Sequence, residues 1–233
     1  MVDLARFWDS FDTSKESFTD DSLKSQLSFE SQYALLCGSA KSGKTSLVLN
    51  YAASVAKENR IVLFLCNKKK IQQSNPVFPN ENHPQFSSIM NRIKIKYFED
   101  GKSLRAYLAN IHFLKKIPSL IILDDLSSIL GAPTFTGMNS PPGSATRSAP
   151  GIGDVAKTLA FLRDAADYFT MCLQKMDAGK CQLLVSETAT PDFTFRQLST
   201  YERWLPLVFL VEAQSTTTNL PGQAASVQVH GTL

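Results

Sequence analysis

The sequence is poor in the residues that build disulfide frameworks and metal clusters. It has four cysteines with no C-x-x-C pair, and three histidines that are far apart in the chain: Cys37, Cys66, Cys172, Cys181, His83, His112 and His230. A structural zinc site needs ligands at short, regular spacings, so this scatter argues against one. We therefore expect four free thiols, in a reducing compartment, rather than a fold held by disulfides.

Long apolar runs are also missing. The sequence has no stretch of about 18 apolar residues, the least that a membrane-spanning helix needs. The N-terminal residues MVDLARFWDSFD lack the apolar core of a signal peptide. Hydrophobic residues make up 43% of the 233 positions and charged residues 19%, which suits one domain with a sizeable core. These features predict a folded chain that does not enter a membrane.

Charge is unevenly distributed along the chain. Residues 1–30 contain seven acidic and three basic side chains, so they carry −4 and the remaining residues +7 of the net charge of +3. This polar segment predicts a flexible, acidic lead-in or, alternatively, a docking segment that buries Phe7, Trp8 and Phe11 on a partner or on the chain itself. The mildly basic remainder permits a polyanionic partner without requiring one.

From residue 31 onward, short apolar runs alternate with segments of helical periodicity. The expected strands are residues 33–37, 61–66, 92–98, 120–123, 181–186 and 207–211, and the expected helices are residues 44–57, 102–114 and 155–172. Strands that alternate with helices indicate an α/β fold, with a mainly parallel twisted sheet and helices on both faces. We expect this core to span residues 31–213.

Three other segments predict loops or a tail. Residues 67–91 are polar and contain three prolines, and residues 131–153 hold four of the eleven prolines and five of the eleven glycines. Such composition is typical of loops, and the second segment predicts a flexible one. Residues 214–233 predict a C-terminal strand, through Val227 and Val229, or a tail.

The clearest chemical motif lies between the first expected strand and the first expected helix. Residues 38–45, GSAKSGKT, fit the pattern G-x-x-x-x-G-K-[ST] of phosphate-binding loops. In such loops backbone N–H groups and a helix N-terminus bind phosphates, the lysine reaches the β- and γ-phosphates, and the hydroxyl binds Mg²⁺. The expected nucleotide-binding residues are Gly38, Ser39, Ala40, Lys41, Ser42, Gly43, Lys44 and Thr45.

A second motif supports the first. Residues 120–125, LIILDD, form an apolar strand that ends in two carboxylates. The carboxyl ends of parallel strands meet at one edge of a sheet, so we expect Asp124, on a strand neighbouring the loop, to complete the Mg²⁺ shell with Thr45. The two motifs together predict ATP and Mg²⁺ as ligands, with Lys44, Asp124 and Asp125 as the candidate catalytic residues.

The order of these parts resembles that of the RecA-type recombinase core. The stretches YALLCGSAKSGKTSLVLNYAA, VLFLCNKKK, RIKIKYFEDGKSLRAYL and PSLIILDDL are similar, more narrowly, to the SWIM-domain-protein-associated ATPase of Shu-type complexes. The resemblance covers roughly residues 33–212. It implies a RecA-like P-loop NTPase core and an ATP-binding nuclear factor that assists homologous recombination and DNA repair. It also implies a zinc-binding SWIM-domain partner, recombinase filament proteins nearby, and single-stranded DNA as a ligand.

The chain departs from that family at two catalytic positions. The resemblance implies a glutamate after the second strand, where the sequence reads Cys66-Asn67-Lys68-Lys69-Lys70. It also implies a γ-phosphate-sensing glutamine where the sequence reads Val185-Ser186-Glu187-Thr188. Asp125 could act as a substitute base, or it could be a helix cap or an outer-shell group. Because loss of a well-placed base costs ~10²–10⁴ in rate, we expect nucleotide binding with slow, DNA-stimulated hydrolysis.

The resemblance also places two DNA-binding loops, at residues 127–153 and 188–204. The second contains rings and arginines that can stack on bases and contact phosphates: Phe193, Phe195, Arg196, Tyr201, Arg203 and Trp204. Alternatively, Phe193, Phe195 and Trp204 pack under the sheet. Lys68, Lys69 and Lys70, with Arg92, Lys94 and Lys96, form a further basic cluster or simply a solvated face.

Two alternative functions stay open. One is a nucleotide-binding scaffold without turnover, which the missing glutamate and glutamine favour. The other is a small-molecule P-loop kinase. Such enzymes usually have several arginines in a lid, whereas residues 131–153 contain only Arg147.

Overall fold

The structure of the protein is a computed structural model that describes residues 32–76, 84–131, 133–134, 146–147, 150–189, 195–211 and 231–232. The acidic lead-in expected over residues 1–30 lies outside these residues, as do Val227 and Val229 of the expected C-terminal strand. Within the described parts of the chain, no helix is both long enough and apolar enough to cross a lipid bilayer.

A sheet with strand order β3-β2-β4-β7-β1-β8-β9 forms the centre of the molecule. Its strands are β1 (Tyr33–Gly38), β2 (Val62–Cys66), β3 (Ile93–Tyr97), β4 (Leu120–Asp124), β7 (Gln182–Thr188), β8 (Leu207–Val211) and β9 (Gly231–Thr232). All neighbours in this sheet pair in parallel except β8 and β9, which are antiparallel. The predicted α/β fold with a mainly parallel sheet is therefore confirmed.

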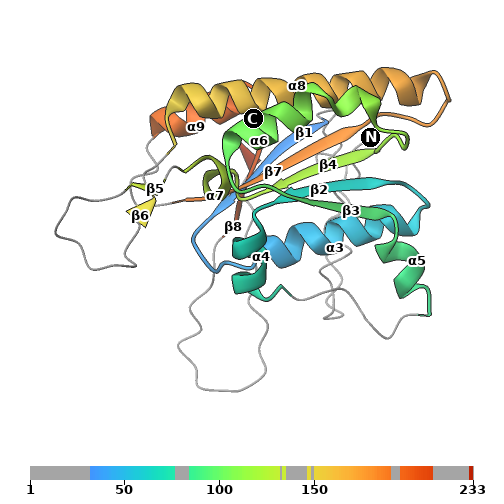
Figure 1. Cartoon of the computed structure of the whole chain (residues 1–233), viewed down its shortest axis with the longest axis horizontal. Helices are drawn as coiled ribbons and strands as arrows, with labels where there is room; N and C mark the ends of the chain where they lie inside the picture. The colour runs from blue at the N-terminus through green and yellow to red at the C-terminus, as the bar shows by residue number, and fades with distance from the viewer. Residues whose placement is uncertain are drawn as a thin grey trace.

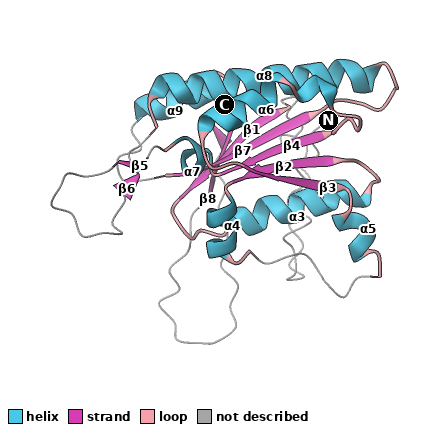
Figure 2. Cartoon of the chain, viewed as in Figure 1, coloured by secondary structure: helices cyan, strands magenta, loops and turns pink. Residues whose placement is uncertain are grey.

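Helices cover both faces of the sheet, as Figures 1 and 2 show. One face carries α3 (Lys44–Lys57), α4 (Lys68–Ser74) and α5 (Phe86–Met90). The other carries α6 (Gly101–Ala109), the 3-10 helix η1 (Ile111–Phe113), α7 (Leu126–Leu130), α8 (Ile152–Gln174) and α9 (Phe195–Glu202). Because alternate strand residues point to opposite faces, Leu35 of β1 packs on the α8 side and Leu36 on the α3 side.

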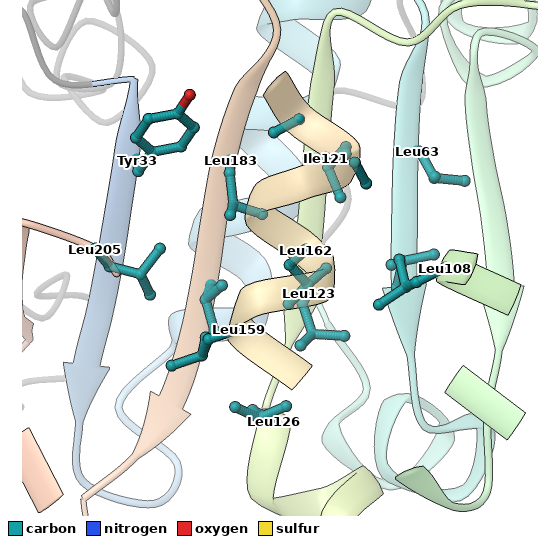
Figure 3. Close-up of a cluster of buried hydrophobic side chains, with 14 of the residues drawn as sticks. Tyr33, Leu63, Leu108, Ile121, Leu123, Leu126, Leu159, Leu162, Leu183 and Leu205 are labelled. Atoms are coloured by element: carbon teal, nitrogen blue, oxygen red, sulfur yellow. The ribbon is translucent and has the colours of Figure 1, made fainter. Parts of the chain in front are cut away.

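The larger core cluster lies between the sheet and α6 and α8. Figure 3 shows Leu159 and Leu162 of α8 beside Leu123 of β4 and Leu183 of β7, and all four belong to one buried cluster. Burying such a side chain contributes about 1.5–3 kcal/mol. This packing fixes the relative positions of the strand ends at which the candidate site lies.

The prediction of a loop over residues 67–91 is wrong, because the structure has the helices α4 and α5 there. Asn67 caps α4 by accepting hydrogen bonds from the backbone N–H groups of Lys69 and Lys70, at 3.0 and 3.3 Å. Each helix has a single fully buried side chain, Ile71 in α4 and Ile89 in α5. Such short helices leave no apolar stripe in the sequence, which explains why periodicity does not predict them.

Two other expected boundaries also change. The helix expected over residues 102–114 is split into α6 and η1 at Asn110. Within the segment 131–153, β5 (Pro133–Thr134) pairs with β6 (Thr146–Arg147), and α8 already begins at Ile152. The rest of that segment, apart from Gly131, Pro150 and Gly151, lies outside the described residues. All four cysteines are free; Cys172 is half-buried and the others are buried.

Candidate functional site

Four strand ends meet at one edge of the sheet. They are the carboxyl ends of β1, β7, β4 and β2, which lie next to one another in the order β2-β4-β7-β1. The segments that follow β1 and β2 pack on the α3 face, whereas those that follow β4 and β7 pack on the α8 face. In α/β folds, ligands bind outside the carboxyl ends of strands at such changes of direction.

The loop of residues 38–45 connects β1 to α3 at this edge. A Cβ atom on Gly38 would lie 2.4 Å from the carbonyl oxygen of Val211, so only glycine fits between β1 and β8 here. Gly43, the N-cap of α3, has φ 85°, a conformation that favours glycine. No side chain caps the N-terminus of this 14-residue helix. The positive end of α3 is therefore available to an anion.

Lys44 is folded over the same loop. Its ammonium donates hydrogen bonds to the backbone oxygens of Gly38 and Ser39, at 2.9 and 2.6 Å, and to Ser42 Oγ at 3.2 Å. Burial lowers the pKa of this ammonium, whereas the nearby charge of Asp125 raises it. Because the hydrogen-bond partners are neutral oxygens, they do not neutralise the buried charge, and an anion bound at the loop would stabilise it.

Asp124 contacts the loop from β4, although not from an adjacent strand. The expectation that its strand neighbours the loop is wrong, because β7 lies between β4 and β1. Thr45 Oγ1 nevertheless donates to Asp124 Oδ2 at 3.0 Å, and Ser186 Oγ of β7 donates to Asp124 Oδ1 at 2.7 Å. Burial raises the pKa of the Asp124 carboxyl, and these two hydrogen bonds lower it. The sheet thus brings together Lys44, Thr45 and Asp124.

These oxygens suit a hard divalent cation. The described residues contain no group of three or more His, Cys, Asp or Glu residues that could hold a metal by themselves. Mg²⁺, however, is usually bound through one or two carboxylates, with waters and substrate phosphates as its other ligands. Thr45 and Asp124 fit that requirement, and Oδ1 of Asp125, buried and without a hydrogen-bond partner among the described residues, is a further acceptor nearby.

Asp125 is held by a lysine from another element. Its Oδ2 forms an ion pair with Lys70 Nζ of α4 at 2.7 Å, and its backbone N–H donates to Ser186 Oγ at 2.8 Å. Asp125 has φ 58° and precedes α7, but its side chain makes no capping hydrogen bond. Asp125 therefore occupies the N-cap position of α7, as the helix-cap interpretation expects, but its side chain does not cap the helix. One oxygen of its carboxylate is thus occupied by the Lys70 ammonium, which argues against Asp125 as a substitute base.

Asn67, in the stretch 66–70 where the resemblance implies a glutamate, has a structural role. Besides capping α4, its Nδ2 donates to the backbone oxygen of Ser128 in α7 at 3.1 Å, and its side chain is buried. Both ends of the amide are therefore engaged away from the loop. Asn67 thereby connects the end of β2 to the segment that follows β4.

Glu187, in the stretch 185–188 where the resemblance implies a glutamine, connects β7 to α7 and α9. Its carboxylate accepts hydrogen bonds from Tyr201 Oη at 2.7 Å, from the N–H of Ser127 at 3.2 Å and from the N–H of Thr188 at 2.8 Å. Burial raises the pKa of Glu187 to about 7, and the charge of Asp125 acts in the same direction. The sequence carries no motif that would have indicated this cluster.

The second expected DNA-binding loop, residues 188–204, contains helix α9. Trp204 packs against the core on the α8 side, so for this ring the packing alternative is confirmed; Tyr201 is buried as well. Arg203 is exposed. Phe193 and the side chains of Phe195 and Arg196 lie outside the described residues.

The six basic residues expected as a further cluster do not lie together. Lys94 and Lys96 alternate on β3 with isoleucines that pack on the α3 face, so these lysines point toward the opposite face. Arg92 precedes β3, at the amino edge of the sheet, where it donates to Ser88 and Asn59. Of the six, only Lys70 is paired with a residue of the candidate site.

A scan of the chain against models of known protein families found no match, and a search of curated proteins found no matching relative.

Proposed function

We propose that the protein binds ATP together with Mg²⁺ at this edge of the sheet and that its fold is a RecA-like P-loop core. The observation that carries the proposal is the 3.0 Å hydrogen bond between Thr45 and Asp124, two residues 79 positions apart, beside the buried ammonium of Lys44. A Mg²⁺-triphosphate needs N–H donors, a cation and hard oxygen ligands at one place. The residues at this edge supply all three.

Each group has a separate task in this proposal. The backbone N–H groups of residues 39–45 donate to phosphate oxygens, and Lys44 exchanges its carbonyl partners for the β- and γ-phosphates. Thr45 and Asp124 hold Mg²⁺, which would neutralise charge on the phosphates. Ser186 keeps the Asp124 carboxylate oriented toward Thr45, because it occupies the other carboxylate oxygen.

Slow hydrolysis, or none, is part of the proposal. The amide of Asn67 stands where the resemblance implies a glutamate, and the Asp125 carboxylate is paired with Lys70. An amide cannot accept the proton of a water molecule, and the Asp125 carboxylate already holds the Lys70 ammonium. These contacts also favour the second candidate function, a scaffold in which the nucleotide is bound but not turned over. Measurable DNA-stimulated hydrolysis would exclude that second candidate.

The cellular role that we propose is that of an accessory factor in homologous recombination and DNA repair. It would act in the nucleus with a zinc-binding SWIM-domain partner and recombinase filament proteins, near single-stranded DNA. Support comes from the likeness of four sequence stretches to recombinase paralogues and from the order of the strands, helices and motifs along the chain. Affinity capture from nuclear extract tests the role, with recovery of a SWIM-domain protein expected. Recovery of neither such a protein nor a recombinase would contradict it.

The nucleotide proposal is tested by direct binding of ATP, with and without Mg²⁺. We expect Lys44→Ala to weaken binding by about tenfold or more, because a charge-assisted contact is lost. Lys57→Ala is the matched control, since Lys57 is an exposed lysine at the far end of the same helix. Equal binding by the wild type and Lys44→Ala, or no binding by a folded wild type, would contradict the proposal.

A further inference from the structure

Lys70 is a second lysine at the candidate site, and it comes from a different element than Lys44. It lies in the first turn of α4, directly after β2, and its ammonium reaches Asp125 just beyond the end of β4. The two strands are neighbours, with Cys66 opposite Asp124. Helix α4 thus delivers a cation to the carboxyl edge of the sheet from the end of β2, the strand that pairs with β4 on the side opposite β7.

The position of Lys70 is built into the structure. Asn67 accepts a hydrogen bond from the backbone N–H of Lys70 at 3.3 Å and donates to α7 through Ser128 at 3.1 Å. On the following position, Ile71 is buried against the α3 face. The backbone of Lys70 is therefore fixed from two directions, and its ammonium is placed by the fold.

A continuous chain of contacts joins Lys70 to the loop. Lys70 pairs with Asp125, the N–H of Asp125 donates to Ser186, Ser186 donates to Asp124, and Asp124 accepts from Thr45, all at 2.7 to 3.0 Å. The Lys70 side chain is 39% exposed, whereas that of Asp125 is 6% exposed. An ammonium has three N–H donors, so Lys70 can keep Asp125 and still offer donors toward the open side.

The two lysines act on each other electrostatically. Both ammonium groups lie at the carboxyl edge of the sheet, and the Asp125 carboxylate is within electrostatic range of each. Two ammonium groups within range of each other repel unless an anion lies near both. Asp125 supplies one negative charge near both, and a polyphosphate whose inner phosphates lie at the loop and whose last phosphate extends past Asp124 would offset more of this repulsion.

We propose that Lys70 binds the terminal phosphate of a nucleoside triphosphate and so makes the site prefer triphosphate over diphosphate. Asp125 is the positioning residue that holds the Lys70 ammonium in place. This inference rests on the proposed nucleotide site and adds to it the sensing of the last phosphate. It also assigns a function to the Lys70–Asp125 ion pair, whose two residues are not part of the phosphate-loop motif.

The test compares the affinities of a non-hydrolysable ATP analogue and of ADP, both with Mg²⁺, for the wild type and three variants. We expect Lys70→Met to lose about tenfold in affinity for the triphosphate, while its affinity for ADP stays within about twofold. Lys70→Arg should keep most of the preference, because it keeps the cation. Lys69→Met is the matched control, since Lys69 is an exposed lysine in the same turn.

The possible results distinguish a failure of the Lys70 inference from a failure of the proposed nucleotide site. Equal loss of triphosphate and diphosphate affinity in Lys70→Met, or no loss of either, would overturn the inference. Because this variant leaves Asp125 buried without its cation, the double variant Lys70→Met with Asp125→Asn removes both charges, and the same loss of preference is expected. If nucleotide binding depends on Lys44 but the preference for triphosphate is unchanged in Lys70→Met and in the double variant, this inference alone is defeated. A folded wild type that binds neither nucleotide defeats the proposed function itself.

Discussion

Glu187 is a buried carboxylate that depends on three hydrogen-bond donors. Burial raises its pKa to about 7, from an ordinary value of 4.5, and the charge of Asp125 raises it as well, whereas its donors lower it. Between these two pH values the folded chain binds the proton more tightly than the unfolded chain does. The free energy of unfolding therefore falls as the pH rises from about 4.5 to about 7.

This linkage makes a prediction for Tyr201→Phe. The substitution removes a donor that the ionised carboxylate of Glu187 needs more than the protonated form does. We expect it to cost about 2 kcal/mol of unfolding free energy at pH 8 and less than about 1 kcal/mol at pH 5, as measured by urea denaturation.

A suitable control for this experiment is Tyr51→Phe. The hydroxyl of Tyr51 donates to the neutral amide of Gln182 at 2.7 Å, also in a buried position. Its loss should therefore cost the same at both pH values. An equal cost of Tyr201→Phe at pH 5 and pH 8 would mean that Glu187 does not change its protonation in that range.

Some residues of the candidate site can be recognised from the sequence alone, and others cannot. Lys44 and Thr45 belong to a local pattern, and Asp124 is the first acid after an apolar run, so each can be recognised without a structure. Ser186 and Lys70 cannot, because their partners Asp124 and Asp125 lie more than fifty positions away in the sequence. Such contacts depend on the strand order, which the sequence pattern leaves open.

Helix α4 is the element on which the Lys70 contact depends. Its seven residues bury a single side chain, Ile71, so packing stabilises it little and the cap from Asn67 matters more. Substitution of a capping asparagine by alanine typically costs about 1 kcal/mol.

We therefore predict a local effect of Asn67→Ala. Backbone amides of residues 68–74 should exchange with deuterium faster, while those of α3 and α8 stay protected, because the substitution removes the cap and the contact with Ser128. Hydrogen exchange followed by mass spectrometry measures both regions. Asn110→Ala is the control, since its Nδ2 bonds only within its own helix, to Ala106. Unchanged exchange in residues 68–74 would show that α4 does not depend on its cap.

Among the helices and strands, those with extensive burial are the ones that the sequence pattern predicts. Strands β2 and β4 are buried at every position and therefore appear as unbroken apolar runs, and α3 has a wide apolar stripe. The bounds of α3 and β8 agree with the prediction at both ends. Helices α4 and α5 lack such a signal and, like α7 and α9, they are not predicted from the sequence.

At the scale of the whole molecule, the strand order determines which side chains lie at the candidate site. Placing β7 between β1 and β4 inserts Ser186 and Glu187 between the loop and the acidic strand end. Prediction of a parallel sheet was sufficient to put Thr45 and Asp124 at the same edge, since carboxyl ends share one edge in any order. That Ser186 of β7 lies beside Asp124 can be known only from the strand order.

The whole fold should respond to the ligand, because the groups that bind it come from segments far apart in the sequence. A ligand that binds only the folded chain raises the free energy of unfolding, by about 2.7 kcal/mol at a hundredfold excess over Kd. For a chain of this size that corresponds to a rise in Tm of about 5–10 °C, measurable by differential scanning fluorimetry with ATP and Mg²⁺. We expect Lys44→Ala to lose most of the rise and Lys57→Ala to keep it. A Tm that ATP and Mg²⁺ do not move, at concentrations where direct measurement shows binding, would mean that the unfolded chain binds them equally well.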